Sequence, residues 1–259
     1  MTKDQGIGIA KRKAHSEEHI AHGEWRMAEG VEAGALIRAF PEPPGKVHLL
    51  YGSDGVFPLS LTMAAHAIRR GVPIAVVDGC NRFDVHLLSR FAREHRLDAN
   101  AFLRRIFISR GFTCYQMEQA VAYRLPAFLR RIGSNVAMVF GLLDTFYDEQ
   151  APLREVRQIL GRVQESFAAM KADGVSLLIV CREQRVLPEE RNQLFTRLKA
   201  GMDRVYRLKS DEVQLVLEGK ESSRNGAPSK DKNHAMTQRR KARNEKMIII
   251  DGRGSIPSL

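Results

Sequence analysis

Cysteine, long apolar runs and acidic residues are scarce in this chain, and each shortage excludes a class of protein. Three cysteines, Cys80, Cys114 and Cys181, lie far apart and lack the paired spacing of a metal site. We interpret them as reduced core thiols of a cytosolic protein. No apolar run approaches the roughly 18 residues that a membrane-spanning helix needs. The basic N-terminus has no apolar stretch after it, so we expect neither a secretory signal nor a membrane partner.

The deficit of acidic residues leaves the chain strongly basic. It has 259 residues, with 41 Lys and Arg against 30 Asp and Glu, and a formal net charge of +11. A positive charge of this size favours a polyanionic partner, of which nucleic acid is the commonest and an anionic membrane surface the rival. The hydrophobic content of 44% suits one globular domain with polar ends.

A glycine turn at residues 52–55 organises the rest of the chain. It follows the apolar run Val47 to Tyr51 and opens into a helical pattern over 59–68. Strand, tight loop and helix in this order are the context of a phosphate-binding loop. Gly52, Ser53 and Gly55 are therefore the candidate residues of a remnant phosphate site, the one place where a cofactor such as ATP would bind.

The chemistry of a working phosphate loop is missing from this turn. Such a loop needs a second glycine at its sixth position, then a lysine for the outer phosphates and a hydroxyl for Mg²⁺. With Gly52 as the first glycine, these positions hold Phe57, Pro58 and Leu59. Proline also lacks the N–H that could donate to a phosphate. We therefore expect no bound cofactor and no metal, and a function that depends on binding.

Apolar runs and helical periods alternate along the middle of the chain. The predicted strands are 47–51, 73–78, 106–109, 135–140 and 175–181, and the predicted helices are 59–68, 81–94, 115–132, 154–172 and 188–200. This alternation predicts an α/β fold with a mostly parallel sheet covered by helices on both faces. Two further strands, 204–208 and 213–217, predict a C-terminal antiparallel hairpin.

Both ends of the chain differ in composition from this middle part. Residues 1–29 predict a basic, helical lead-in, in which His15, His19 and His22 form either a metal or pH site or a solvated helix face. Residues 30–218 form the predicted core domain, and 219–259 a flexible basic tail. The candidate nucleic-acid residues of the tail are Lys230, Lys232, Arg239, Arg240, Lys241, Arg243 and Lys246. Cationic runs of this kind neutralise phosphates without reading sequence.

Three local patterns resemble the RecA-like recombinase core, in particular the archaeal and eukaryotic strand-exchange proteins and their RadB-like paralogues. They are the glycine turn, the segment DGCNRFDVHLLSRFARE (78–94) and the segment SRGFTCYQMEQAV (109–121). The resemblance covers about residues 30–218. It implies a RecA-like P-loop fold and a nucleotide site at the glycine turn.

The departures from this family are concentrated in the catalytic positions. The resemblance places Cys80 where the family has its catalytic glutamate, and Gly141 where the family has the aspartate that ends the fourth strand. Asp144, a little further along, is an open substitute for that aspartate. Since phosphoryl transfer depends on positioning and charge neutralisation, the combined losses predict a protein without ATPase activity.

Three functions stay open at this stage. The first is a catalytically inactive, RecA-like accessory or scaffold protein in DNA repair or recombination, binding DNA non-specifically and assembling with itself or with an active recombinase or repair protein. The second is a nucleotide-binding sensor or weak ATPase that uses the remnant loop. The third is a structural partner protein that binds no nucleic acid.

Overall fold

The computed structural model of the chain describes residues 40–209 and 215–218. The predicted lead-in 1–29 and the predicted tail 219–259, with all seven candidate nucleic-acid residues, lie outside these ranges. So do the three histidines of the lead-in.

A single mixed sheet forms the centre of the described part of the chain. Its strands are β1 (Val47–Gly52), β2 (Ile74–Asp78), β3 (Ile106–Arg110), β4 (Val136–Phe140), β5 (Ser176–Arg182), β6 (Arg204–Leu208) and β7 (Leu215–Glu218). Their order across the sheet is β3-β2-β4-β5-β1-β6-β7. Strands β1 to β6 run parallel, which confirms the predicted α/β class and its mostly parallel sheet.

The last strand runs against the others. Backbone pairs join β7 to β6 in antiparallel register, from Val205 opposite Glu218 to Leu208 opposite Leu215. Residues 210–214, which connect the two strands, lie outside the described ranges, so the turn of the predicted hairpin stays a prediction.

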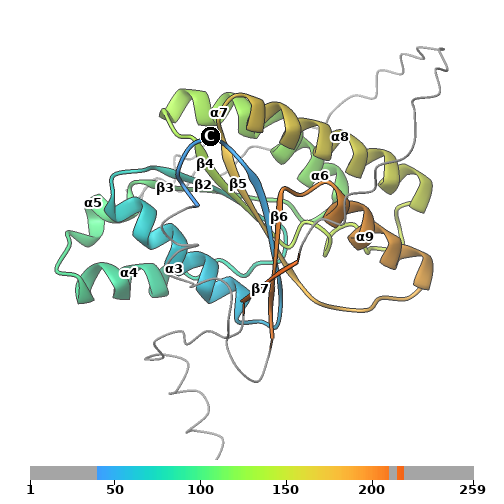
Figure 1. Cartoon of the computed structure of the whole chain (residues 1–259), viewed down its shortest axis with the longest axis horizontal. Helices are drawn as coiled ribbons and strands as arrows, with labels where there is room; N and C mark the ends of the chain where they lie inside the picture. Colours follow the sequence, from blue (N-terminus) through green and yellow to red (C-terminus); the bar gives the residue numbers. More distant parts are fainter. Residues whose placement is uncertain (1–39, 210–214, 219–259) are drawn as a thin grey trace, which may run out of the picture.

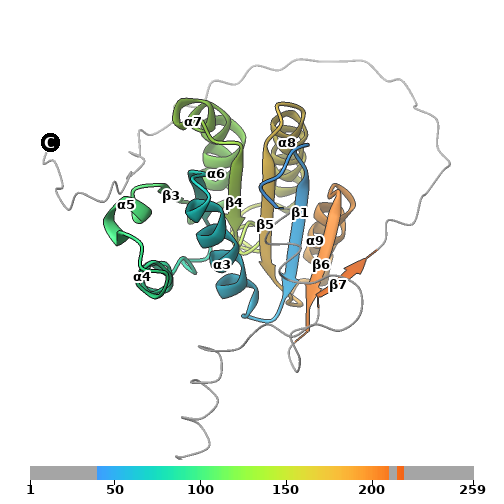
Figure 2. The same cartoon turned by 60° about the vertical axis from the view of Figure 1, so that its left-hand side comes forward.

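Helices cover both faces of the sheet (Figures 1 and 2). One face carries α3 (Val56–Arg69), α4 (Val85–Glu94) and α5 (Ala99–Leu103). The other face carries α6 (Cys114–Glu118), the π-helix η1 (Gln119–Arg124), α7 (Leu125–Ile132), α8 (Leu153–Ala172) and α9 (Gln193–Ala200), which follows the 3₁₀ turn η2 (Glu189–Asn192). Among the described residues, no helix is long and apolar enough to cross a membrane.

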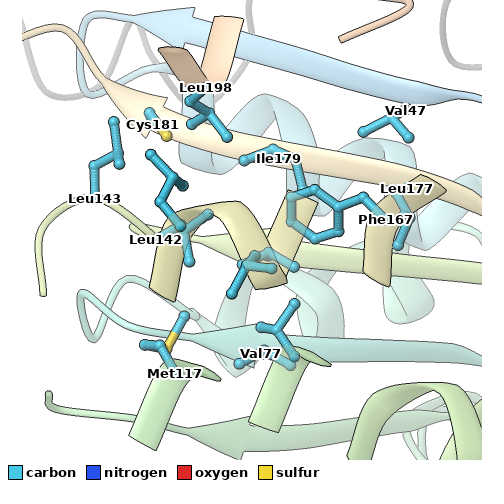
Figure 3. Packing of buried hydrophobic residues seen from close by; sticks show 14 of the residues in the cluster. Val47, Val77, Met117, Leu142, Leu143, Phe167, Leu177, Ile179, Cys181 and Leu198 are labelled. Carbon is cyan, nitrogen blue, oxygen red and sulfur yellow. The ribbon is translucent and has the colours of Figure 1, made fainter. Parts of the chain in front are cut away.

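Successive side chains of a strand point to opposite faces of the sheet. Since helices cover both faces, the side chains on both sides of the strands are mostly apolar. In β5, Leu177 and Ile179 pack under α8, where the ring of Phe167 lies against them (Figure 3). Leu178 and Val180 of the same strand pack under α3. The near-continuous apolar runs in the sequence are therefore explained by a sheet buried on both faces.

Side-chain caps mark the starts of three helices. The carboxylates of Asp84 and Asp98 accept backbone N–H groups at the starts of α4 and α5, and the Thr113 hydroxyl does so at α6. The structure differs from the sequence prediction in several helices. Helix α3 starts three residues early, at Val56, and α4 starts four residues late, at Val85. The short α5 was not predicted, the single helix predicted over 115–132 is interrupted by η1, and the helix predicted over 188–200 is divided into η2 and α9.

Candidate functional site at the carboxyl end of the sheet

The carboxyl ends of the parallel strands lie together at one edge of the sheet. In the strand register, Gly52 is opposite both Arg182 and Leu208, and Asp78 is opposite both Arg110 and Phe140. Ligands of open α/β sheets bind outside this edge. The loops that follow β1, β2, β3, β4 and β5 therefore define the candidate site, and they include the predicted residues Gly52, Ser53 and Gly55.

The loop after β1 is too short to wrap around a phosphate group. Only Ser53, Asp54 and Gly55 separate β1 from α3. The amides at the start of α3 are already paired: Val56 donates to the Ser53 carbonyl at 3.1 Å and Phe57 donates to the Asp54 carbonyl at 3.3 Å. A phosphate loop needs such N–H groups to point at the ligand. Here they close the turn instead.

Gly52 has a packing role in this turn. Its φ of +146° lies in a region that residues with a side chain rarely adopt, and a Cβ at this position would lie 2.0 Å from the backbone oxygen of Leu208. Ser53 N–H donates to the same oxygen at 3.3 Å. Two of the three candidate residues thus contact the neighbouring strand β6.

Phe57 stands at the sixth position counted from Gly52, where a working phosphate loop has its second glycine, and its side chain belongs to the core. Phe57 is only 4% exposed, and its ring packs edge-on against Phe140 at 5.7 Å between centroids. The guanidinium of Arg82 lies 5.8 Å from the centroid of the same ring. The hydroxyls of the next helical turn are also engaged, since Ser60 donates to the Val56 carbonyl and Thr62 to the Pro58 carbonyl.

Two arginines from different strands converge on the loop after β1. Arg82 follows β2 and Arg182 ends β5, and their guanidinium nitrogens lie 3.9 and 3.8 Å from Oδ1 of Asp54. Both arginines are close to half exposed and the Asp54 side chain is 60% exposed. The Asp54 carboxylate therefore lies beside both guanidinium groups, in the place that an anionic ligand of the two arginines would take.

Asp78, at the end of β2, holds the neighbouring loop in place. Its side chain is fully buried and accepts the backbone N–H groups of Cys80, Arg82 and Phe83. This loop carries the thiol of Cys80, the residue that the predicted family resemblance sets at the position of a general base. Burial, followed by the nearby Asp78 carboxylate, raises the pKa of this thiol, so Cys80 stays protonated at neutral pH. A protonated thiol cannot take a proton from water.

Asp144 lies beside this thiol at the end of β4. Gly141, with φ of +60°, begins the turn, and a Cβ there would lie 2.5 Å from the Cys80 sulfur and 2.8 Å from Oδ2 of Asp144. Burial raises the pKa of the Asp144 carboxyl, against the opposing effect of Arg182. The amide of Gln184 contacts Oδ1 of Asp144 at 3.4 Å. Asp144 is thus at the site edge, as its proposed role as a substitute requires, but that role stays a prediction.

The loops after β4 and β5 are joined by a buried arginine. Arg191 of η2 is 4% exposed and donates to the carbonyls of Phe146 and Ala151, at 2.8 and 2.6 Å. Asn192 ties the second loop to itself through the backbone of Val186. A hollow of about 660 Å³ lies beside this loop, lined by Glu183, Gln184, Arg185, Glu189, Asn192, Phe195 and Thr196.

The carboxyl edge of the sheet therefore carries both acidic and basic side chains, and few side chains that could bind a metal or act as a nucleophile. Within residues 40–209 and 215–218, no three His, Cys, Asp or Glu side chains are grouped so that they could hold a metal ion. The three cysteines are free thiols, with Cys114 and Cys181 buried and Cys80 only partly so. What the edge does present is half-exposed arginine, at Arg82, Arg110 and Arg182.

Sequence reasoning missed the convergence of Arg82 and Arg182 on Asp54, and it missed the exposed side chain of Phe112 after β3. The first depends on the strand order, which brings β5 next to β1. The second had a signal in the sequence, because Phe112 lies between the end of a strand and a capping threonine.

Comparisons with models of known protein families and with curated protein sequences find no match for this chain. The family resemblance therefore stays a prediction.

Proposed function

We propose that this chain is a RecA-like protein without ATPase activity that acts as an accessory or scaffold in DNA repair or recombination. One observation carries the proposal: the turn at Ser53–Gly55 uses the first N–H groups of α3 for its own carbonyls. The arginines beside it contact the Asp54 carboxylate. These features favour a fold that keeps the scaffold of a nucleotide site while the chemistry of phosphate binding is lost.

The positive charge supports DNA as the partner. The net charge of +11 includes the seven basic residues of the tail between Lys230 and Lys246. Basic side chains bind DNA phosphates and release the counterions around them. The resulting affinity falls steeply as the salt concentration rises, and it does not depend on ATP.

The outer edge of β3 supports a protein partner in addition. Within the described ranges β3 pairs with β2 alone, so its other edge is open to a further strand. An apolar cavity of about 20 Å³, lined in part by Phe107, Leu125 and Phe128, lies beside this edge. Assembly with a second copy or with an active recombinase through this edge is part of the proposal.

DNA titration with labelled single and double strands tests the proposal, at two salt concentrations and with and without Mg-ATP. We expect salt-sensitive binding that ATP does not change, together with no ATP hydrolysis. Deleting residues 219–246 should abolish most of this binding, whereas deleting the basic residues 1–14 serves as the matched control. Hydrolysis of ATP, or DNA binding that survives loss of the tail at full strength, would contradict the proposal.

A nucleotide sensor is the second candidate, and one observation favours it. The Asp54 carboxylate is exposed, so a phosphate group that displaced it would meet both Arg82 and Arg182. A ligand present at one hundred times its dissociation constant adds about 2.7 kcal/mol to the free energy of unfolding. Thermal stabilisation by Mg-ATP, increased further in Asp54→Asn, would support the sensor; no shift in either protein would exclude it.

A further inference from the structure

Phe112 is a large apolar side chain held outward by a rigid loop. Its side chain is 67% exposed. The backbone around it is fixed: Phe112 N–H donates to Oε1 of Gln116 at 2.8 Å, and Gly111 N–H donates to the Asp78 carbonyl at 3.2 Å. Thr113 caps α6 by accepting the N–H of Gln116. The backbone that carries the ring is therefore held in place, and the exposure of Phe112 does not come from a loose loop.

A second aromatic side chain follows in the first turn of α6. Tyr115 is 43% exposed. Gly111, on the other side of Phe112, is required by close packing, because a Cβ there would lie 2.8 Å from the sulfur of Met117. The loop is thus packed tightly underneath and aromatic on its outer side.

The chain that leads into this loop is cationic, although acidic groups lie near its far side. Burial raises the pKa of the Cys114 thiol, two residues after Phe112, and the carboxylates of Glu155 and Asp148 lie close enough to raise it further. From Ala99 to Met117 the sequence contains three arginines and no acidic residue. Arg110 immediately precedes the loop, with its side chain 45% exposed. Arg82 belongs to the adjacent loop, since Asp78 accepts the N–H of Arg82 through its side chain and that of Gly111 through its carbonyl. Both arginines already lie near carboxylates: Arg110 is 4.0 Å from the buried Asp78 and Arg82 is 3.9 Å from the exposed Asp54. A phosphate at this loop therefore competes with Asp54 for Arg82.

Exposed aromatic rings between arginines match one class of ligand. A base stacks on an aromatic ring while the guanidinium groups contact the adjoining phosphates. Bases of a duplex are stacked on each other and do not reach such a ring. Protein interfaces are also rich in aromatic side chains and arginine, but they bury about 800 Å² on each partner, a larger area than one short loop.

We propose that Phe112 and Tyr115, together with Arg110 and Arg82, form a stacking surface for single-stranded nucleic acid at the carboxyl ends of β2 and β3. This inference rests on the proposed DNA binding and names its preferred strand form. The basic tail supplies affinity that is indifferent to strand form, and the aromatic loop supplies the preference for unpaired bases.

Titration of the full-length protein with a labelled oligothymidylate and with a duplex of equal length tests the surface. Phe112→Ala should weaken binding of the single strand by about five-fold or more, as loss of one stacking contact does, and leave duplex binding unchanged. Phe112→Trp should retain the wild-type affinity. Tyr123→Ala is the matched control, because Tyr123 is a 54% exposed aromatic side chain of η1, outside the loops of the candidate site, and its loss should change neither titration.

The outcomes separate this inference from the function on which it rests. If wild-type protein binds both DNA forms and Phe112→Ala changes neither affinity, the stacking surface is wrong and the DNA accessory stands. Equal losses for single strand and duplex would also overturn the stacking surface. If wild-type protein binds no DNA at low salt, both proposals fail. Thermal melting of each variant confirms that the fold is retained.

Discussion

The two ends of the sheet differ in the burial of their polar side chains. At the amino end, His48 is buried between Phe40 and Tyr206, and Nδ1 of His48 and Oγ of Ser176 have no hydrogen-bond partner among the described residues. At the carboxyl end, Arg82 and Arg182 are close to half exposed. The contrast teaches that side chains at the amino end are tied to the stability of the fold. At the carboxyl end, arginine side chains remain in contact with solvent.

The largest effect should come from Gly52, where the carboxyl end leaves no room for a side chain. Gly52→Ala forces a Cβ against the Leu208 backbone, so we expect a loss of more than about 3 kcal/mol in the free energy of unfolding. Gly133→Ala is the control: its φ is also positive, but a Cβ there meets no atom within 4 Å. Its cost should be near 1 kcal/mol. Equal losses in urea denaturation would show that Gly52 is not a packing residue.

Lowering the pH should reduce the free energy of unfolding through the buried His48 at the amino end of the sheet. Burial, with Lys46 acting in the same direction, lowers the pKa of His48 from 6.5 to about 4. The unfolded chain therefore binds a proton that the folded chain does not, and stability falls as pH drops from about 6.5 towards 4. The loss should approach about 3 kcal/mol.

Urea midpoints at pH 7, 5.5 and 4 measure this loss. His48→Gln should flatten the decline, because the neutral amide does not titrate. The Asp144 carboxyl acts in the opposite direction, since a raised folded pKa makes protonation stabilising as pH falls. A wild-type decline that His48→Gln leaves intact would assign the acid sensitivity to other groups.

A matched pair of aspartates compares the two ends directly. At the amino end, Asp203 accepts the N–H of Val47 at 2.9 Å and pairs with Lys171 at 2.5 Å. Asp203→Asn should cost about 1 to 2 kcal/mol, since a charged acceptor is lost at a partly buried position. The free energy of unfolding from urea titration measures the change.

The same substitution at the carboxyl end should have the smallest effect. Asp54→Asn removes two exposed ion pairs, and exposed pairs contribute from about zero to 1 kcal/mol. We expect a loss below about 0.5 kcal/mol at 0.15 M salt and a smaller one at 1 M salt. A loss larger than that of Asp203→Asn would reverse the comparison between the two ends.

Much of the fold was predictable because it depends on local patterns. Runs such as residues 74–78 and 176–182 are apolar and rich in Val, Ile and Leu, which indicates buried strands. The five-residue α5 escaped because it is too short for a helical period, although Asp98 caps it. The π-helix η1 escaped because one extra residue per turn leaves no distinct hydrophobic pattern.

The candidate site was predictable only in part, because some of its contacts join residues that are far apart in the sequence. The missing lysine and hydroxyl after Gly52 are local features and were read directly. The contacts of Asp54 with Arg82 and Arg182 join residues from separate strands, and the strand order needed to bring them together is not encoded in any short segment. The exposure of Phe112 likewise depends on what the surrounding chain leaves uncovered.

The buried Arg191 has a mechanical consequence for this edge. Its two hydrogen bonds fasten the loop after β5 to the loop after β4, so neither loop swings alone unless a buried cation loses its carbonyl partners. The two loops are therefore coupled, and a ligand that displaces one of them has to displace the other as well.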